Sequence, residues 1–283
     1  MRRILITLIV CFYILPTFAY TVDITTLGAK GDGITDNTAF IQKAIDDCSA
    51  RSKGGTVEIP SGHFLTRTLF LKSNVNLHLH FGAELLGSTD LDSYHKVFPE
   101  LKGKESPALI FARGVANIAI TGSGTINGQG AHQNFQHGND SKGGPRRPKI
   151  IYFIGCNNVR VQDVTLRNSA YWTQDYEKCN GVIVRGVKVY SHANWNNDGL
   201  DIDSRNVVVS DCYIDCDDDA LCLKSDTDTP CENVTVTNCV LKSNCNAIKF
   251  GTSSYSGFKN VTISNCTIDR ASEDHIRQWY KNY

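Results

Sequence analysis

The chain has 283 residues, and its 29 lysine and arginine residues are balanced by 29 aspartate and glutamate residues. A formal net charge of zero gives no support to binding of nucleic acid or of a membrane surface, so any partner has to be argued from local charge. The length is sufficient for one sizeable domain.

The N-terminus has the order of a secretory signal peptide. A positively charged start, MRR, is followed by an apolar run from Ile4 to Leu15 and by small residues before a predicted cleavage site after Ala19. The run is short for a bilayer, which takes roughly 20 apolar residues, and no later segment is more apolar. We therefore predict that residues 1–19 are a signal peptide. The mature protein, from Tyr20, is expected to be secreted or periplasmic without a transmembrane segment.

The next predicted element is a short amphipathic helix between Asp36 and Ser52. Asn37 or Thr38 is the candidate N-cap, and the apolar residues that follow recur at helical spacing. We expect this helix to cover the N-terminal end of the domain, where uncovered strand edges would otherwise be exposed. Its apolar positions are Phe40, Ile41, Ala44 and Ile45.

A repeat dominates the second half of the chain. Its units begin 23 to 27 residues apart, and the residues at offsets one, three, six and eight from each start are apolar in all of them. A period of this length indicates a solenoid, and short alternating Val- and Ile-rich runs indicate parallel strands stacked about 4.8 Å apart. An antiparallel sandwich would not explain columns that keep their character over all the units. The starts are Asn158, Gly181, Asn206, Asn233 and Asn260.

We therefore predict an all-β fold, a single-stranded right-handed parallel β-helix whose coils extend from about Asn117 to the C-terminus, within one domain over residues 20–283. A bend is expected between offsets three and six of each unit. The cysteine column at offset six, formed by Cys212, Cys239 and Cys266, could form disulfides, but small packed hydrophobes fit an inward position better.

Acidic residues are dense between Asn196 and Asp228. Superposing the leucines at 200 and 221 places Asp198 and Asp219 on neighbouring coils, with Asp218 beside them. Like charges at that distance raise at least one pKa, and one protonated plus one ionised carboxyl can cleave a glycosidic bond. Asx-turns or calcium binding are the alternative, and the spacing alone leaves both open.

Several segments resemble glycoside hydrolase family 28, the polygalacturonase family, over residues 23–277. The resemblance implies a β-helix of the pectin-lyase type and hydrolysis of an α-linked galacturonate polymer with inversion of configuration, without metal or cofactor. The segment near the N-terminus is weakly specific, whereas the paired acidic blocks are specific. The matching segments are 28–38, 147–153, 168–172, 196–201 and 218–219.

The resemblance also implies roles for the acidic residues. Asp218 would protonate the leaving oxygen, while Asp198 and Asp219 would hold and deprotonate the attacking water. Adjacent strand residues face opposite sides, so a bulge or bend is expected at 218–219. Asn196, and His192 just before the first acidic block, are expected to lie near the substrate.

Two positions depart from the family pattern. Gly-His-Gly of the family falls at Cys245-Asn246-Ala247, so Asn246 stands where a histidine is usual and can orient a group without titrating. Arg-Ile-Lys falls at residues 277–279, which keeps Arg277 and loses the lysine. We expect Arg277 to bind a substrate carboxylate, Lys249 to supply the missing charge, and Asn246 to contact substrate.

Family members continue for several more coils beyond the position of Tyr283, so the domain is expected to lack its last coils. A truncated copy and an oligomer that covers the final coil both fit, and the oligomeric state stays open. The predicted function is a secreted hydrolase of acidic pectic polysaccharide. Its rivals are a calcium-dependent lyase and a catalytically degenerate carbohydrate-binding protein.

Overall fold

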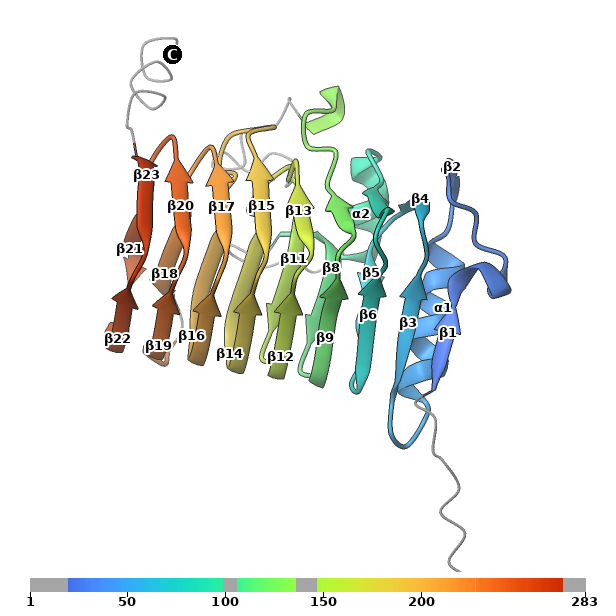
Figure 1. The fold of residues 1–283 in the computed structure, drawn as a ribbon, viewed down its shortest axis with the longest axis horizontal. Coiled ribbons are helices and arrows are strands. Elements are labelled where there is room, and N and C mark those ends of the chain that lie inside the picture. The colour runs from blue at the N-terminus through green and yellow to red at the C-terminus, as the bar shows by residue number, and fades with distance from the viewer. Residues whose placement is uncertain (1–19, 99–105, 136–146, 227, 272–283) are drawn as a thin grey trace, which may run out of the picture.

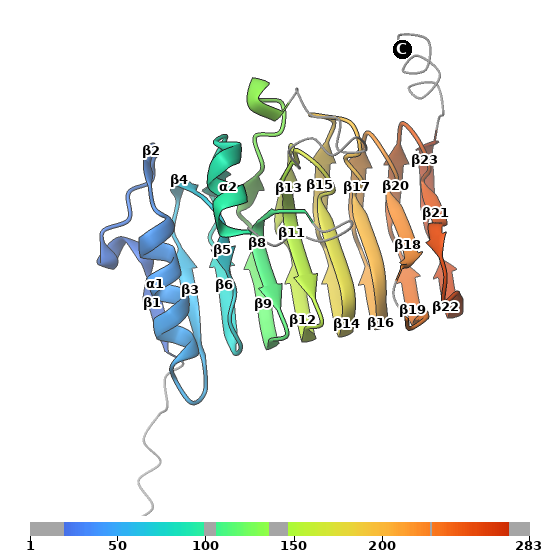
Figure 2. The same cartoon turned by 180° about the vertical axis from the view of Figure 1, so that it is seen from behind.

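The computed structural model describes residues 20–98, 106–135, 147–226 and 228–271, and these form a right-handed parallel β-helix (Figures 1 and 2). The strand pairings are parallel, and each strand pairs with its counterpart one coil away. Side chains at alternate positions therefore point into one continuous apolar core. The predicted fold class is confirmed.

The first sheet has two branches, here called lower and upper, and from β5 (Leu69–Phe70) onward each coil contributes to both. The long strands β14 (Gln174–Arg185) and β16 (Leu200–Ser210) belong to both branches, since β14 pairs with β11 and β12 and β16 pairs with β18 and β19. The lower branch comprises β1 (Thr21–Asp23), β3 (Gly55–Ile59), β6 (Val75–Leu79), β9 (Ala116–Gly122), β12 (Asn157–Gln162), β19 (Cys231–Thr237) and β22 (Phe258–Ser264). The upper branch comprises β5 (Leu69–Phe70), β8 (Ala108–Arg113), β11 (Lys149–Ile154), β18 (Leu221–Ser225) and β21 (Ile248–Ser254).

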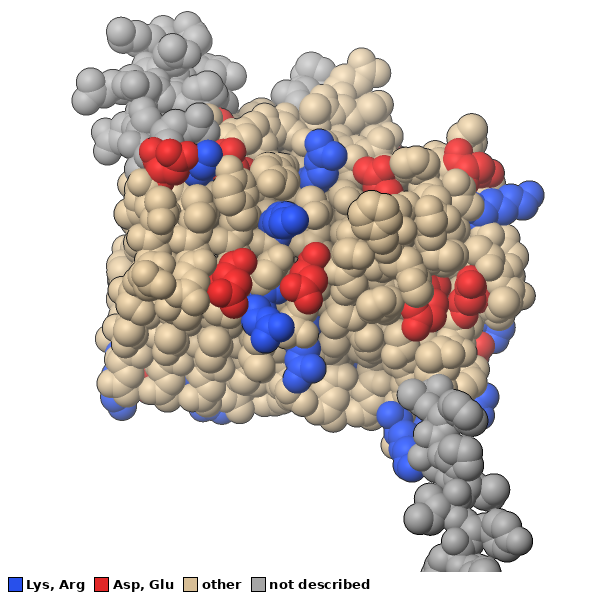
Figure 3. Space-filling model, viewed as in Figure 1, with Lys and Arg blue, Asp and Glu red and all other residues tan. Residues whose placement is uncertain are grey.

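The second sheet closes each coil. It comprises β2 (Asp32–Asp36), β4 (Gly62–Thr66), β7 (Ala83–Gly87), β10 (Thr125–Asn127), β13 (Thr165–Arg167), β15 (Lys188–Ser191), β17 (Tyr213–Cys216), β20 (Val240–Ser243) and β23 (Thr267–Ala271). Figure 3 shows the face that this sheet presents, on which acidic and basic side chains are intermixed and no large patch carries one sign of charge. Short 3₁₀ helices occupy Ile24–Leu27 and Gln133–Phe135.

The predicted columns are confirmed. Val182 pairs with Val159 and Val207, and the offset-eight residue Val189 pairs with Leu166 and Ile214. These residues are buried, so the alternation in the sequence does mark the inner face. The described cysteines are free, and Cys212 and Cys239 donate their Sγ hydrogens to backbone carbonyls inside the core. The interpretation of this column as small hydrophobes is therefore confirmed.

The β-helix begins earlier than the sequence indicated. Parallel pairing already joins β1, β3 and β6, well before Asn117. The spacing of the early coils is irregular because helix α1 (Thr38–Ser49) intervenes between β2 and β3, and helix α2 (Leu91–Val97) with its flanking chain intervenes between β7 and β8. An interrupted period hides the repeat although the core pattern is the same.

Helix α1 (Thr38–Ser49) lies at the N-terminal end of the β-helix, as predicted (Figures 1 and 2). Asn37 is its N-cap residue but makes no capping hydrogen bond, because its buried side chain bonds the backbone of Lys30 and Thr35. Asp36 instead accepts from the Thr38 N–H at 3.0 Å. In the described part of the chain neither helix is long and apolar enough to cross a membrane.

A ladder of asparagines marks one corner of the coils. Asn206 donates to Asn180 at 2.7 Å and accepts from Asn233 at 3.0 Å, and Asn260 continues the row by donating to Asn233 at 2.9 Å. Asn206, Asn233 and Asn260 have φ between 52° and 55°, a left-handed conformation that asparagine tolerates better than most residues. The corner therefore combines a conformational preference with a side-chain ladder.

We expect Asn206→Ala to lower the free energy of unfolding by roughly 1–3 kcal/mol, because alanine pays the left-handed strain and breaks both ladder bonds. Asn206→Gly is the matched control, since glycine adopts positive φ without strain and loses only the hydrogen bonds. Urea unfolding of the two variants measures the difference. Equal stability of both variants would contradict a conformational role for this corner.

Candidate active site

The acidic blocks lie in equivalent connections of successive coils, where the second sheet ends and the upper branch begins. Leu200 pairs with Leu221, which pairs with Ile248, so the predicted registration is confirmed. The Gly199 N–H donates to the Asp219 carbonyl, and the Ala220 N–H donates to the Asn246 carbonyl, each at 2.8 Å. Asp198, Asp219 and Asn246 therefore follow one another from coil to coil along the axis of the β-helix.

Asp218 and Asp219 lie in a bend between β17 and β18, as predicted for two adjacent side chains that reach one site. The Asp219 N–H donates to Asp218 Oδ1 at 2.8 Å, and Asn196 Nδ2 donates to Asp218 Oδ2 at 3.3 Å. Burial and then the neighbouring charge of Asp219 raise the pKa of Asp218 above its ordinary value. Asp218 is thereby favoured as a proton carrier.

Asp219 is buried and receives two donors. Asn246 Nδ2 donates to its Oδ1 at 2.7 Å, and Lys249 Nζ forms an ion pair with its Oδ2 at 2.7 Å. Burial lowers the pKa of Lys249, but the hydrogen bond and charge of Asp219 outweigh burial and raise it overall. The predicted site residues Asn246 and Lys249 thus both contact a predicted catalytic carboxylate.

A second lysine that the sequence analysis missed lies beside Asp198. Lys224 Nζ is 2.9 Å from Asp201 Oδ1 and 3.8 Å from Asp198 Oδ2, and only 11% of its side chain is exposed. Cys222 and Lys224 alternate with two inward leucines in β18, so a lysine on the outer face of this strand was the available signal. Its reach back to Asp201 could not be derived from strand spacing.

Asp198 and Asp201 are buried carboxyl groups with too few hydrogen bonds. Asp198 Oδ1 and Asp201 Oδ2 have no hydrogen-bond partner among the described residues. Burial, followed by the charge of Asp201, raises the pKa of Asp198 far above its ordinary value, and burial raises the pKa of Asp201 to about 7 against the opposing pull of Lys224. Burial therefore favours the protonated form of both carboxyls.

An aromatic and cationic wall adjoins these carboxyls. The Nζ atoms of Lys149 and Lys224 each lie 4.4 Å from the centre of the Trp172 ring, and the Tyr171 ring stacks on Trp172 at 5.2 Å. Lys149 is buried and forms an ion pair with Asp175, the residue that pairs with Asp201 across the sheet. Cationic and aromatic side chains at one place can recognise an acidic sugar.

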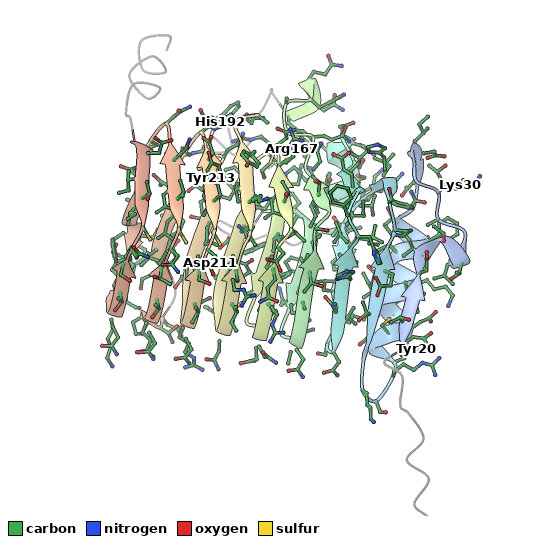
Figure 4. All side chains as sticks on the ribbon, viewed as in Figure 1. Tyr20, Lys30, Arg167, His192, Asp211 and Tyr213 are labelled. Atoms are coloured by element: carbon green, nitrogen blue, oxygen red, sulfur yellow. The ribbon has the colours of Figure 1, made fainter. Side chains whose placement is uncertain are left out.

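The remaining predicted site residues are His192 and Arg277, and of these the structure describes His192. His192 lies at the end of β15 (Figure 4), where its Nε2 is 2.8 Å from Asp215 and its Nδ1 is 4.0 Å from Asp217. The carboxylates of Asp217 and Asp215 raise its pKa. It is therefore beside the acidic block, although its described ion pairs are not with the three predicted catalytic carboxyls. Arg277 and the predicted signal peptide lie outside the described residues.

Two sets of potential metal ligands are present within this site. One is Asp198, Asp201 and Cys222, and the other is Asp218, Asp219 and Cys245, with ligand atoms within 4.8 Å of one another in each set. Lysine ammonium groups already pair with Asp201 and Asp219. A divalent cation would have to overcome the repulsion of these ammonium groups, so the donor sets do not favour calcium.

We expect Asp201→Asn to change how stability depends on pH. The folded chain keeps a proton on Asp201 up to about pH 7, whereas the unfolded chain loses it near pH 4, so the contribution of Asp201 to stability falls as pH rises between these values and is constant above them. In the Asp201→Asn variant this fall in stability with rising pH is absent. The variant's free energy of unfolding should match wild type near pH 4 and exceed it at pH 7 by on the order of a few kcal/mol.

Urea unfolding at several pH values between 4 and 8 measures this difference. Asp228→Asn is the control, because the Asp228 side chain is 88% exposed and its nearest cation is 3.9 Å away. A variant Asp201→Asn whose stability relative to wild type does not change with pH would refute a buried protonated carboxyl at this position.

Comparisons with known proteins identify relatives of this chain. The chain is 32% identical over 225 residues to a Vitis vinifera protein named "Probable polygalacturonase", covering 74% of this chain and 45% of that protein. It is 30% identical over 251 residues to the exo-poly-alpha-D-galacturonosidase of Dickeya chrysanthemi, covering 71% and 41%. It thus spans less than half of the length of these curated relatives.

The exopolygalacturonase structure from Thermotoga maritima superposes with a TM-score of 0.76 at 27% identity, covering 87% of this chain and 66% of that one. The sequence profile of glycosyl hydrolases family 28 matches residues 48–277, which include the described acidic blocks. This chain therefore belongs to glycosyl hydrolases family 28.

Proposed function

We propose that this protein is a secreted polygalacturonase that hydrolyses an α-linked galacturonate polymer with inversion of configuration. The observation that carries the proposal is the convergence of Asp198, Asp218 and Asp219 from neighbouring coils on one site. Family membership and the two curated relatives support the same reaction class. Secretion is supported by the predicted signal peptide over residues 1–19.

Asp218 acts as the general acid. Burial and the charge of Asp219 raise its pKa and so favour the protonated carboxyl, and the hydrogen bonds from Asn196 and from the Asp219 N–H fix its orientation. Transfer of this proton to the glycosidic oxygen makes the sugar a better leaving group. A carboxylate oxygen of Asp218 lies within 4.8 Å of one of Asp219, which is closer than the roughly 6.5–9.5 Å that usually separates the acid from the base in inverting enzymes.

Asp219 and Asp198 share the activation of that water. Asp219 accepts the water proton, while Lys249 and Asn246 hold its carboxylate in place. Asp198, whose pKa is far above its ordinary value, orients the water through a hydrogen bond. The environments of the carboxyls therefore assign different tasks to chemically identical groups.

The acidic substrate is bound by cations around the same site. Lys249 is 31% exposed beside Asp219, and the wall of Lys149, Lys224 and Trp172 adjoins Asp198 and Asp201. Arg277 adds a bidentate partner for a sugar carboxylate in this proposal. A cationic surround also offsets the repulsion between the polymer and the enzyme carboxyls.

One observation favours a second candidate function. Asn246 occupies the position of the family's histidine, and an amide cannot transfer a proton at neutral pH. If the reaction requires a group that transfers a proton at this position, this chain would bind the polysaccharide without cleaving it. The two candidates differ in turnover and agree in binding.

We expect Asp218→Asn to reduce hydrolysis of polygalacturonate by a factor of roughly 10² or more, because an amide cannot supply the proton. The release of reducing ends, measured with and without a chelator, reports the reaction, and ultraviolet absorbance would instead report elimination by a lyase. Asp211→Asn is the control, since Asp211 accepts from Asn238 at another corner of the same coil.

Chelator-resistant reducing ends in wild type, lost in Asp218→Asn and retained in Asp211→Asn, support hydrolysis by the proposed acid. Binding of the polymer without reducing ends or absorbance supports the carbohydrate-binding alternative. An unimpaired Asp218→Asn variant contradicts the assignment of the acid.

A further inference from the structure

A cluster of two histidines and one glutamate lies on the early coils that contain β3 and β6, several coils before the acidic blocks next to β16 and β18. His78 in β6 and Glu58 in β3 are direct partners across the sheet, and His80 follows His78 by two residues on the same outward face. One ligand atom of each lies within 4.8 Å of the others. The flanking residues of β3 and β6 are buried, so the pleat turns all three side chains outward together.

We propose that Glu58, His78 and His80 form a binding site for one divalent transition-metal ion of the kind that takes imidazole and carboxylate ligands, such as Zn²⁺. Two histidines and a carboxylate are a known ligand set for zinc, with water in the fourth position. His78 lies in β6 and His80 directly follows its last residue, Leu79, and residues two apart in extended backbone direct their side chains to the same side. The remaining ligand comes from the neighbouring strand.

The hydrogen bonds around His78 prepare it as a ligand. Thr121 Oγ1 donates to Asn76 Oδ1 at 2.9 Å, so the same hydroxyl accepts from His78 Nδ1 at 2.8 Å. This arrangement places the ring proton on Nδ1 and leaves the Nε2 lone pair for a metal. Histidine ligands in metal sites are commonly held in this way by an outer partner on the other ring nitrogen.

The other two ligands are already paired and partly exposed. His80 Nε2 is 2.6 Å from Glu58 Oε2, and half of the His80 side chain is exposed to solvent. Zinc bonds of about 2.0–2.1 Å require ligand atoms about 3.3 Å apart, which small side-chain rotations at such exposed positions can reach. The ion would replace the hydrogen bond between His80 and Glu58 with two metal bonds.

This cluster differs from the acidic ligand sets of the candidate active site. In those sets, Lys224 and Lys249 place ammonium groups against the carboxylates. For Glu58, the ion pair in the described residues is with His80, itself a ligand. Binding would join β3 to β6 and stabilise the first coils against opening.

The experiment is titration of the mature protein with Zn²⁺ at about pH 7.5, by calorimetry and by thermal unfolding. We expect wild type to bind one Zn²⁺ at this site and to unfold at a higher temperature in its presence. His78→Ala and His80→Ala should lose both effects. Thr121→Val should weaken binding by about tenfold or more, because it removes the group that orients His78.

His63→Ala is the matched control. His63 also pairs with a glutamate on the neighbouring strand, Glu84, at 2.7 Å, but the residues two positions away are Ser61 and Leu65. This variant should bind zinc as wild type does. Melting without zinc verifies that each variant is folded.

Absence of saturable zinc binding to wild type overturns the proposal. Equal binding by wild type and His78→Ala also overturns it, since the ion would then be held by buried thiols or by the acidic site. Because polygalacturonate hydrolysis is measured separately, failure of this proposal is distinguishable from failure of the proposed function.

Discussion

The main-chain hydrogen bonds between successive coils are the constraint on which the site depends. They hold Asp198, Asp219 and Asn246 in register through the Gly199 and Ala220 N–H groups. A slip by one residue would turn the buried valine and isoleucine columns toward solvent, so the carboxyls cannot relieve their repulsion by sliding. The free energy gained by burying the apolar columns along the β-helix therefore opposes the repulsion between the carboxyls.

Partly buried lysines offset the repulsion between these carboxyls. Lys224 lies against Asp201 and near Asp198, and Lys249 lies against Asp219. Burial alone would lower the pKa of Lys224, but its attraction to Asp201 and Asp198 raises it instead, so the ammonium stays charged. Among the described residues, Asp218 accepts hydrogen bonds from Asn196 and from the Asp219 N–H rather than from a lysine. This environment fits a group that gives up a proton.

The sequence predicted what depends on period, and it missed what depends on side-chain reach. The columns and the stacking of Asp198 on Asp219 follow from spacing, because parallel coils repeat in register, whereas the bend at 218–219 follows from the roles that the family resemblance implies. The early coils were missed because α1 and α2 interrupt their period. Lys224 was missed because a flexible four-carbon stem extends along the strand to a residue outside its own rung.

Asn246 and Lys249 together hold the Asp219 carboxylate. A histidine at position 246 offers both a hydrogen-bond donor and a titratable charge. Here Asn246 donates to Asp219 Oδ1 at 2.7 Å, and Lys249, three residues further along the chain, supplies a permanent charge to Oδ2 at the same distance. Orientation and charge are thus divided between an amide and an ammonium. The Asp219 carboxylate is therefore held at both oxygens without a titrating side chain at position 246.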